Sequence, residues 1–346
     1  MTAAAAAGTR GMQDAASPTL AIIVTCYNYA AFVGRCIASV QAQTSGDYEL
    51  LVVDDGSTDR SWEVITATGV RAVRTANGGQ RAACHHGVGL TSAPYILFLD
   101  ADDELSPDAV ATIVAHLDPQ VAKLQFPLER IDGDGRPTGQ GPVAALGAFR
   151  VREALQRRIL ATGVHATPPT SGNVFRRDVC ALLDEASYDR AVDGVILFAA
   201  PFLGDVVGLP QVLGRYRIHG GNDSGLGNRL AAGTMRRDLD RFRDRTAHLA
   251  QVIARLLPSA RLTAADETFY ARERLFCLDI LEGRRPSPGR LAGLCAALWR
   301  DYLTLRQKSL LSLLYLAAMV LPPARAADLL AYRFGQRPAG RKVEGA

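Results

Sequence analysis

Three carboxylates stand almost side by side in the segment Asp100-Ala101-Asp102-Asp103. They follow an apolar run, Tyr95–Leu99, that has the length and composition of a buried strand. Oxygen ligands at this spacing suit Mg²⁺ or Mn²⁺, which also coordinate substrate phosphates. Such a metal neutralises the charge that develops on a diphosphate leaving group. The acids could instead cap a helix that begins near Ser106-Pro107, so a metal site and a helix N-terminus both stay open.

The elements that must position these acids alternate along the first hundred residues. Strands are expected at 20–25, 48–53, 72–75 and 95–99, and helices at 32–43, 59–67 and 80–90. This alternation predicts an α/β fold with a parallel sheet and helices on both of its faces. A second acidic segment, Asp54-Asp55-Gly56-Ser57, also follows a strand, although an Asx-capped turn is an alternative interpretation of it. Because ligands bind beyond the carboxyl ends of such strands, both segments are expected at one edge of the sheet.

The composition describes a globular protein with an uneven charge. Hydrophobic residues make up 48% of the 346 residues and charged residues 21%, which excludes a disordered or fibrous chain. The net charge of +4 hides a basic part from Arg229 to the end, with 21 Lys and Arg against 11 Asp and Glu. Such a surface favours anionic partners, or it is only a solvated helical surface. No nucleic-acid-binding motif is present.

The cysteines and the apolar runs bear on location. Six scattered cysteines without a CxxC pair predict reduced thiols in a cytoplasmic protein. Met1–Ser17 is interpreted as a disordered leader, because it lacks the apolar core of a signal peptide. The longest apolar run, Leu310–Leu321, has 12 residues and is too short to cross a bilayer.

Four motifs in order carry a family resemblance. They are Val24-Thr25-Cys26-Tyr27-Asn28, Val52-Val53-Asp54-Asp55-Gly56-Ser57-Thr58-Asp59, Asn77-Gly78-Gly79-Gln80 and Phe98-Leu99-Asp100-Ala101-Asp102-Asp103. Together they resemble glycosyltransferase family 2, the inverting transferases of the GT-A fold. The resemblance implies that a sugar, such as a hexose, moves from a nucleotide-sugar donor to a glycan or lipid-linked acceptor. UDP is the default nucleotide, with GDP and dTDP as alternatives.

The resemblance also implies roles for individual residues. Thr25 and Tyr27 would line the nucleoside pocket, Asp55 would contact the base, and Asp100 would reach the ribose. Asp102 would bind Mn²⁺ or Mg²⁺ directly, and His219 would complete the metal shell. The full set expected to bind the nucleotide sugar is Thr25, Tyr27, Asn28, Asp55, Asn77, Gly79, Gln80, Asp100, Ala101 and Arg217.

The acceptor side is expected in a later part of the chain. An inverting transfer needs a base for the acceptor hydroxyl. The resemblance places it at Asp193, in Ala191-Val192-Asp193-Gly194, with a helix N-cap as the alternative role. Asp184, Glu185 and Asp189 are competitors for the role of base. Ser171, Gly172 and Asn173 match the family segment that borders the acceptor.

One departure from the family pattern leaves a second function open. Cys84 and His85 stand where the family often has Arg-Asn, so a contact with donor phosphates is in doubt. A degenerate homologue that binds nucleotide or glycan without turnover is therefore the alternative. A sugar-phosphate nucleotidyltransferase would need a Gly-rich basic loop after the first strand, and Thr25-Cys26-Tyr27-Asn28 stands there instead.

The sequence predicts three regions, and the resemblance covers only the second of them. They are a leader at 1–17, a GT-A catalytic domain at 18–225 and a helical C-terminal region at 226–346. Arg306 and Lys308 precede the apolar run 310–321 and Arg325 follows it, as in helices that lie on a membrane surface. Burial against the catalytic domain is the other interpretation. The location expected is cytoplasmic, with peripheral contact at the inner face of the cell membrane.

Overall fold

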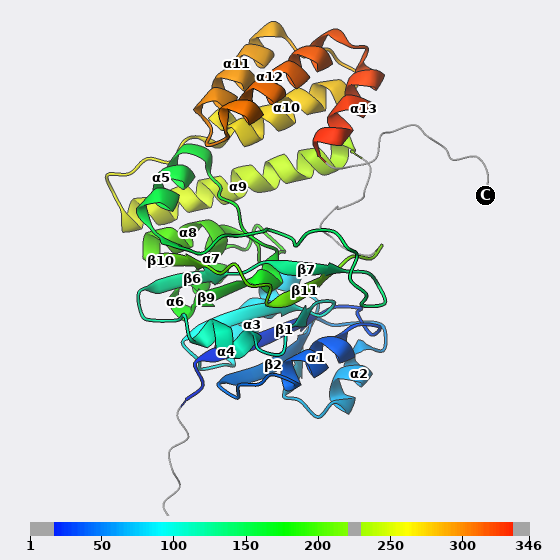
Figure 1. The fold of residues 1–346 in the computed structure, drawn as a ribbon, viewed down its shortest axis with the longest axis vertical. Helices are drawn as coiled ribbons and strands as arrows, with labels where there is room; N and C mark the ends of the chain where they lie inside the picture. The colour runs from blue at the N-terminus through cyan, green and yellow to red at the C-terminus, as the bar shows by residue number, and fades with distance from the viewer. Residues whose placement is uncertain (1–16, 221–229, 335–346) are drawn as a thin grey trace, which may run out of the picture.

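The computed structural model describes residues 17–220 and 230–334, which form an α/β part and a stack of helices (Figure 1). Among these residues the strands lie between Leu20 and Arg217, and the C-terminal helices begin at Ala232. The predicted boundary at 225/226 and the predicted leader, except Ser17, lie outside the described residues.

The main sheet has eight strands in the order β3-β2-β1-β4-β9-β6-β10-β8. Their bounds are β1 (Leu20–Cys26), β2 (Tyr48–Asp54), β3 (Ala72–Arg74), β4 (Tyr95–Asp100), β6 (Val121–Gln125), β8 (Phe149–Val151), β9 (Asn173–Arg176) and β10 (Asp205–Gly208). β1 pairs in parallel with β2 and β4, and its register places Thr25 beside Asp100 and Cys26 beside Asp54. The two acidic segments therefore begin at the same edge of the sheet, as predicted.

Helices cover both faces of this sheet, because the strands are apolar on both sides. Along β1, Leu20 and Ile22 enter one core while Ala21 and Ile23 enter the other. The first core includes α1 (Val33–Gln41), α2 (Ser61–Ala67) and α4 (Ala109–Val114). The second includes α3 (Gln80–Gly89), α5 (Glu153–Thr162), α6 (Arg177–Cys180), α7 (Leu182–Glu185) and α8 (Val195–Leu203). Every element predicted between residues 20 and 99 agrees with the structure within two residues at each end.

The prediction of a parallel sheet holds for β3-β2-β1-β4 and for the pair β6-β10, and it is wrong for β9 and β8. β9 runs antiparallel to β4 and to β6, and β8 runs antiparallel to β10. The chain enters β9 from a loop at the edge where β4 ends, so its direction is reversed. An apolar run identifies a buried strand, but it carries no signal for strand direction.

A small second sheet closes the site edge. Its order is β5-β11-β7, with β5 (Glu104–Leu105), β11 (Gly214–Arg217) and β7 (Leu128–Ile131). β5 directly continues the acidic segment, so β11 is brought beside those acids. The chain after β7 folds back on it through the bridges Leu128–Val143 and Ile131–Pro137.

The C-terminal helices pack around a core of their own. They are α9 (Ala232–Leu256), α10 (Phe269–Leu281), α11 (Pro288–Arg300), α12 (Leu305–Val320) and α13 (Pro323–Arg333), with the short helix η2 (Ala265–Glu267) between α9 and α10. Residues 282–287 connect α10 to α11. α9 also sends Leu249, Val252 and Ile253 into the core beneath α8. In the described ranges, no helix has the length and apolar character needed to span a bilayer.

Candidate active site

The loops that follow β1 and β2 are hydrogen-bonded to each other at the edge of the sheet. The side-chain oxygen of Asn28 accepts hydrogen bonds from the Thr58 backbone N–H (2.7 Å) and the Asp59 N–H (3.3 Å). Asn28 adopts a left-handed φ of 59°, which asparagine tolerates better than most residues. The neighbouring Tyr27 keeps 44% of its surface exposed, while Thr25 is buried. The residues expected around a nucleoside thus lie together, with an aromatic ring open to a ligand.

Asp55 holds the glycine loop in place. Its two oxygens accept hydrogen bonds from the Gly78 and Gly79 N–H groups, each at 2.8 Å. Gly79 has φ 87°, and a Cβ there would lie 3.1–3.2 Å from Arg190 atoms, so a glycine is required. Each carboxylate oxygen can accept a second hydrogen bond. The expected contact between Asp55 and the base stays a prediction.

Gln80 connects the two halves of the site. Its side-chain amide donates to Asp100 Oδ1 (2.6 Å), and its carbonyl oxygen accepts from the Val192 N–H (3.1 Å). The next residue, Arg81, donates from Nε to the carbonyl of Asp189 (2.9 Å) and from its backbone N–H to the carbonyl of Arg190 (2.8 Å). The first turn of α3 therefore brings segment 189–194, which contains Asp193, to Asp100. Sequence reasoning missed Arg81, although it directly follows the recognised Gly-Gly-Gln motif.

Ser171 and its neighbours are more enclosed than an acceptor-side role requires. The Ser171 hydroxyl donates to Asp103 Oδ2 (2.6 Å) and accepts from the Asp100 N–H (3.1 Å). Asn173 is fully buried and donates to the carbonyls of Pro168 and Pro169. Gly172 is also buried, and a Cβ there would lie 2.7 Å from Pro168. In this structure the three residues shape the acidic turn and the loop beneath it.

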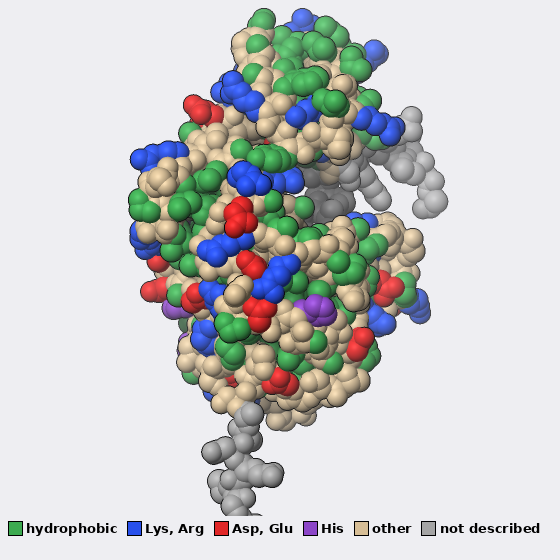
Figure 2. Space-filling view, turned by 60° about the vertical axis from the view of Figure 1, so that its left-hand side comes forward, with side chains coloured by type: hydrophobic (Ala, Val, Ile, Leu, Met, Phe, Trp, Pro, Cys, Tyr) green, Lys and Arg blue, Asp and Glu red, His purple; other side chains and the backbone are tan. Residues whose placement is uncertain are grey.

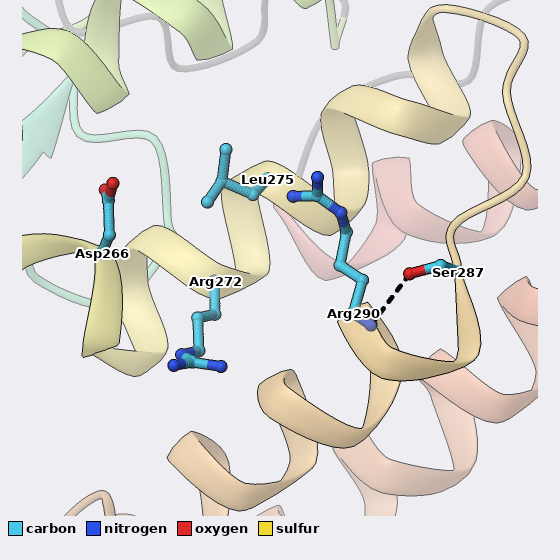
Figure 3. Close-up of a pocket in the computed structure, with 5 residues that line it drawn as sticks. All are labelled: Asp266, Arg272, Leu275, Ser287 and Arg290. Atoms are coloured by element: carbon cyan, nitrogen blue, oxygen red, sulfur yellow. Dashed lines mark hydrogen bonds between the residues drawn. The ribbon is translucent and has the colours of Figure 1, made fainter.

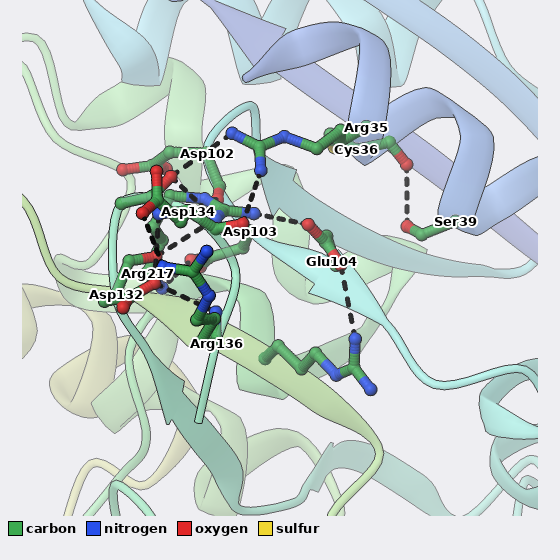
Figure 4. Close-up of polar contacts among 12 residues, drawn as sticks. Arg35, Cys36, Ser39, Asp102, Asp103, Glu104, Asp132, Asp134, Arg136 and Arg217 are labelled. Atoms are coloured by element: carbon green, nitrogen blue, oxygen red, sulfur yellow. Dashed lines mark hydrogen bonds and ion pairs between the residues drawn. The ribbon is translucent and has the colours of Figure 1, made fainter. Parts of the chain in front are cut away.

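Arg217 is the largest fully buried side chain near the acids (Figure 4). Its backbone N–H donates to Asp103 Oδ1 (3.0 Å), and its Nε donates to the Asp102 carbonyl (2.8 Å). The guanidinium also forms an ion pair with Glu104 and donates to the Asp132 carbonyl (3.1 Å). β11 lies between β5 and β7, and this position encloses the guanidinium. Through these hydrogen bonds Arg217 stabilises the acidic turn. This differs from the predicted contact with the nucleotide sugar, since the side chain has no accessible surface.

The expected metal ligands do meet. His219 Nε2 lies 2.9 Å from Asp102 Oδ2, and the His219 ring stacks on Phe32 with 4.7 Å between the ring centres. Within residues 17–220 and 230–334, no three His, Cys, Asp or Glu side chains are arranged to hold a metal ion. A pair of ligands nevertheless fits Mg²⁺ or Mn²⁺, which bind through few protein groups and complete their shell with water and substrate phosphates. The Ala101 side chain is buried between the acids.

The electrostatics of the acidic turn favour a cation. Burial raises the pKa of Asp100 well above its usual range, and the neighbouring carboxylates of Asp103, Asp102 and Asp193 raise it further. Burial and Asp102 also raise the pKa of Asp103, against the hydrogen bonds from Ser171 and Arg217. These carboxylates repel one another in a poorly solvated place, and a bound divalent cation would relieve that repulsion.

Asp193 lies half-buried in the loop before α8. The helix begins after Gly194 with no side-chain cap, so the alternative role of Asp193 as N-cap is not what the structure shows. Burial raises the pKa of Asp193, against a hydrogen bond from Thr170 and the positive charges of Arg241 and Lys123. A carboxylate with a raised pKa is a stronger base than an exposed one.

The competing carboxylates are engaged elsewhere. Asp189 Oδ2 lies 2.8 Å from Arg241 Nε, and Glu185 Oε2 lies 2.7 Å from Arg255. The Asp184 side chain is 80% exposed on α7. The negative charge of Asp193, by contrast, contributes to the raised pKa of Asp100.

The departure at Cys84 and His85 removes a positive charge. Cys84 is fully buried beside Thr25, and burial raises the pKa of its thiol well above the usual range. His85 lies 3.9 Å from Asp184, and His86 is exposed on the same helix. An arginine at position 84 would have brought a cation beneath the site, and the cysteine does not.

A separate pocket of about 350 Å³ lies in the helical part, between η2, α10 and α11 (Figure 3). It is lined by Asp266, Arg272, Leu275, Ser287 and Arg290. Arg290 is paired with Asp279 (2.8 Å) and Asp266 with Arg243 (2.7 Å), so most of its charge is already compensated. It contains no residue of the acidic turn.

Comparisons with known proteins agree with this geometry. Residues 21–181 match the family model described as glycosyl transferase family 2. An uncharacterized glycosyltransferase of Nostoc sp. (strain PCC 7120) is 35% identical over 215 residues, which are 59% of this chain and 66% of the relative. The uncharacterized glycosyltransferase EpsJ of Bacillus subtilis (strain 168) is 37% identical over 94 residues, 26% of this chain and 27% of the relative. The chain thus spans less than two thirds of either relative.

A solved structure extends the likeness to the whole fold. S. aureus TarS 1-349 in complex with UDP-GlcNAc matches with a TM-score of 0.52 and 18% identity, over 92% of each chain. At this identity the match shows the fold alone. It confirms the predicted GT-A type sheet flanked by helices and followed by a helical region.

Proposed function

We propose that this chain, which belongs to glycosyl transferase family 2, transfers a sugar from a nucleotide-sugar donor to an acceptor hydroxyl with inversion. The observation that carries the proposal is the position of Gln80. Its amide joins Asp100 to the backbone of Val192, next to Asp193. One side chain thereby sets the separation between the donor-side acids and the carboxylate that would activate the acceptor.

The donor would lie along the edge where β1, β2 and β4 end. The exposed ring of Tyr27 offers a stacking surface for the base, and Asp100 lies next to Thr25 for the ribose. A UDP-sugar is the default donor, and the TarS structures that share the fold hold UDP or UDP-GlcNAc. GDP-sugars and dTDP-sugars are the alternatives.

Asp102 and His219 would hold Mn²⁺ or Mg²⁺. When bound, the cation would neutralise the negative charge of the diphosphate leaving group. The chain's own contribution is to hold the two ligands at the right place. Ser171 and Arg217 do so by donating to the two oxygens of the Asp103 carboxylate, and Arg217 Nε also donates to the Asp102 carbonyl.

Asp193 would take the proton from the acceptor hydroxyl as that oxygen attacks the sugar carbon. Nearby Lys123 and Arg241 favour its ionised form, while burial strengthens it as a base. We take the acceptor to be a glycan or a lipid-linked glycan, as in the family. We place the enzyme in the cytoplasm because all six cysteines are free thiols, which persist in reducing compartments.

The donor site is tested by calorimetric titration of the full chain with UDP, GDP and dTDP, with and without Mn²⁺. We expect metal-dependent binding of one nucleotide, and a loss of at least tenfold in affinity in Asp102→Asn. Asp108→Asn is the matched control, because it removes an exposed carboxylate from the same segment. Equal nucleotide binding by wild type and Asp102→Asn would contradict the assignment.

The second candidate, a homologue that binds without turnover, is favoured by the missing cation at Cys84. Release of free UDP from a panel of UDP-sugars separates the two functions. A rate that Asp193→Asn abolishes without changing UDP affinity supports transfer. Nucleotide binding with no release of UDP from any donor, with or without glycan acceptors, supports the second candidate.

A further inference from the structure

The second half of helix α12 is apolar on every side. Its last eight residues, Leu313–Val320, contain no charged or amide side chain, and the polar residues of the helix are confined to its first half. A helix with this composition belongs in a protein core or in contact with lipid. In α12 only one side is in a core, where Tyr315 and Ala318 are buried against the other C-terminal helices.

The other side of α12 is open. Leu305, Leu310, Leu313, Leu316 and Val320 are between 50% and 74% exposed. From residue 310 onward their spacing of three, three and four places them on one face of the helix. We call these five residues the α12 stripe.

An aromatic residue of α11 borders this stripe. The indole N–H of Trp299 donates to Ser312 Oγ (3.2 Å), and Lys308 Nζ donates to the Trp299 carbonyl (2.9 Å). Trp299 and the following Tyr302 are each 50% exposed. Tryptophan and tyrosine are enriched where proteins meet the boundary between lipid and water.

The charges around the stripe are mainly basic. From Pro288 to Phe334 the chain has six Lys and Arg against two Asp, and Arg300, Arg306 and Arg325 are exposed. Hydrophobic and basic side chains gather over the C-terminal helices in Figure 2. A second copy of the chain on the same face would bring like charges together. Anionic lipid headgroups would instead complement them.

We propose that the α12 stripe, with Trp299 and the surrounding arginines, is a docking face for an anionic membrane surface. The helix would lie in the plane of the headgroups, because its 16 residues are shorter than the ~20 needed to span a bilayer. The proposal goes beyond sugar transfer, since docking needs neither donor nor acceptor. It gives the prediction of peripheral membrane contact a defined surface.

The test is co-sedimentation of the full chain with two kinds of vesicle. One kind is phosphatidylcholine alone, and the other also contains roughly 30–40% phosphatidylglycerol to mimic an anionic leaflet. We expect binding to the anionic vesicles that weakens with salt. Leu313→Ser/Leu316→Ser should lower the partition coefficient at least about tenfold. Arg300→Gln/Arg306→Gln should lower it roughly fivefold for each charge removed. Val212→Ser, which changes an exposed apolar residue of the α/β part, is the control and should bind as wild type does.

Three outcomes would overturn the proposal. One is no binding of the wild type to anionic vesicles. Another is a Leu313→Ser/Leu316→Ser variant that unfolds at the same temperature as the wild type and still binds anionic vesicles as well as the wild type does. The third is a concentration-dependent dimer, seen by light scattering without lipid, that this variant abolishes; the stripe would then join two copies. The sedimentation assay contains no nucleotide sugar. Its result therefore does not depend on whether the transferase assignment is correct.

Discussion

Replacing Arg217 by methionine tests whether this residue supports the acidic turn or binds the donor. The guanidinium is fully enclosed, and Glu104, its ion-pair partner, is 15% exposed. Removing one partner of a buried pair costs about 3–5 kcal/mol. Here the loss would leave Glu104 with the half-exposed Arg215 and take a donor from the Asp102 and Asp132 carbonyls. At about 2 °C per kcal/mol for a chain of this size, the melting temperature should fall by roughly 6–10 °C.

The matched control lies two residues away on the same strand. Arg215 also pairs with Glu104 (3.6 Å) and with Glu129 (3.5 Å), but 46% of its side chain is exposed. Exposed pairs contribute about 0–1 kcal/mol, so Arg215→Met should lower the melting temperature by no more than about 2 °C. Differential scanning fluorimetry and urea unfolding of the full chain measure both variants.

The opposite result would refute the reasoning. If Arg217 bound donor phosphates, Arg217→Met would weaken UDP binding by tenfold or more and leave the melting temperature near that of Arg215→Met. Arg217→Lys separates charge from geometry, because lysine keeps the charge but lacks the planar fork. We expect it to recover less than half of the lost stability.

Three further results follow from single positions. Asp193→Asn should lower UDP release by at least about a hundredfold without weakening UDP binding. In the wild type the rate should fall as pH drops through a pKa that burial raises above the usual aspartate range, as a pH–rate profile shows. Burial lowers the pKa of Lys123 from 10.5 to about 7, so the wild type should gain stability from about pH 7 to 10.5, where only the unfolded chain holds that proton. Urea midpoints at pH 7 and pH 9 should show this gain disappear in Lys123→Met. Gly69→Ala, with φ 72° and open space, should cost about 1–2 kcal/mol in urea unfolding from the backbone alone. Gly79→Ala should cost more, because φ is 87° there and Arg190 atoms also lie 3.1–3.2 Å from the new Cβ.

The first half of the fold could be predicted because local signals there are redundant. β1, β2 and β4 each contain an apolar run that ends in polar sequence, and helical segments lie between the strands. Strand direction beyond β4 could not be predicted. β9 has four residues, and its place between β4 and β6 depends on pairing with segments about 50 to 80 residues away. No local pattern encodes such a pairing.

The candidate site divides in a similar way. Asp100, Asp102 and Gln80 could be found from motifs, because their chemistry is evident from residue type and position. Arg217 and Ser171 were expected to face ligands, since both are polar residues in segments that resemble the family's binding segments. Sequence shows that a side chain can bind, but the register of β11 and the turn before β9 direct both of them to Asp103.

The helical part contributes to the site through one arginine that no motif indicated. Arg241 on α9 pairs with Asp189 (2.8 Å) and donates to the Asp193 carbonyl (3.2 Å). From the other side, Gln80 and Arg81 hold the same segment to α3. The candidate base therefore stands between an anchor on the α/β part and an anchor on the C-terminal helices. Any shift of α9 against α8 would move the Asp193 backbone relative to Asp100, so the region that the family resemblance leaves unexplained helps to set the geometry of the proposed reaction.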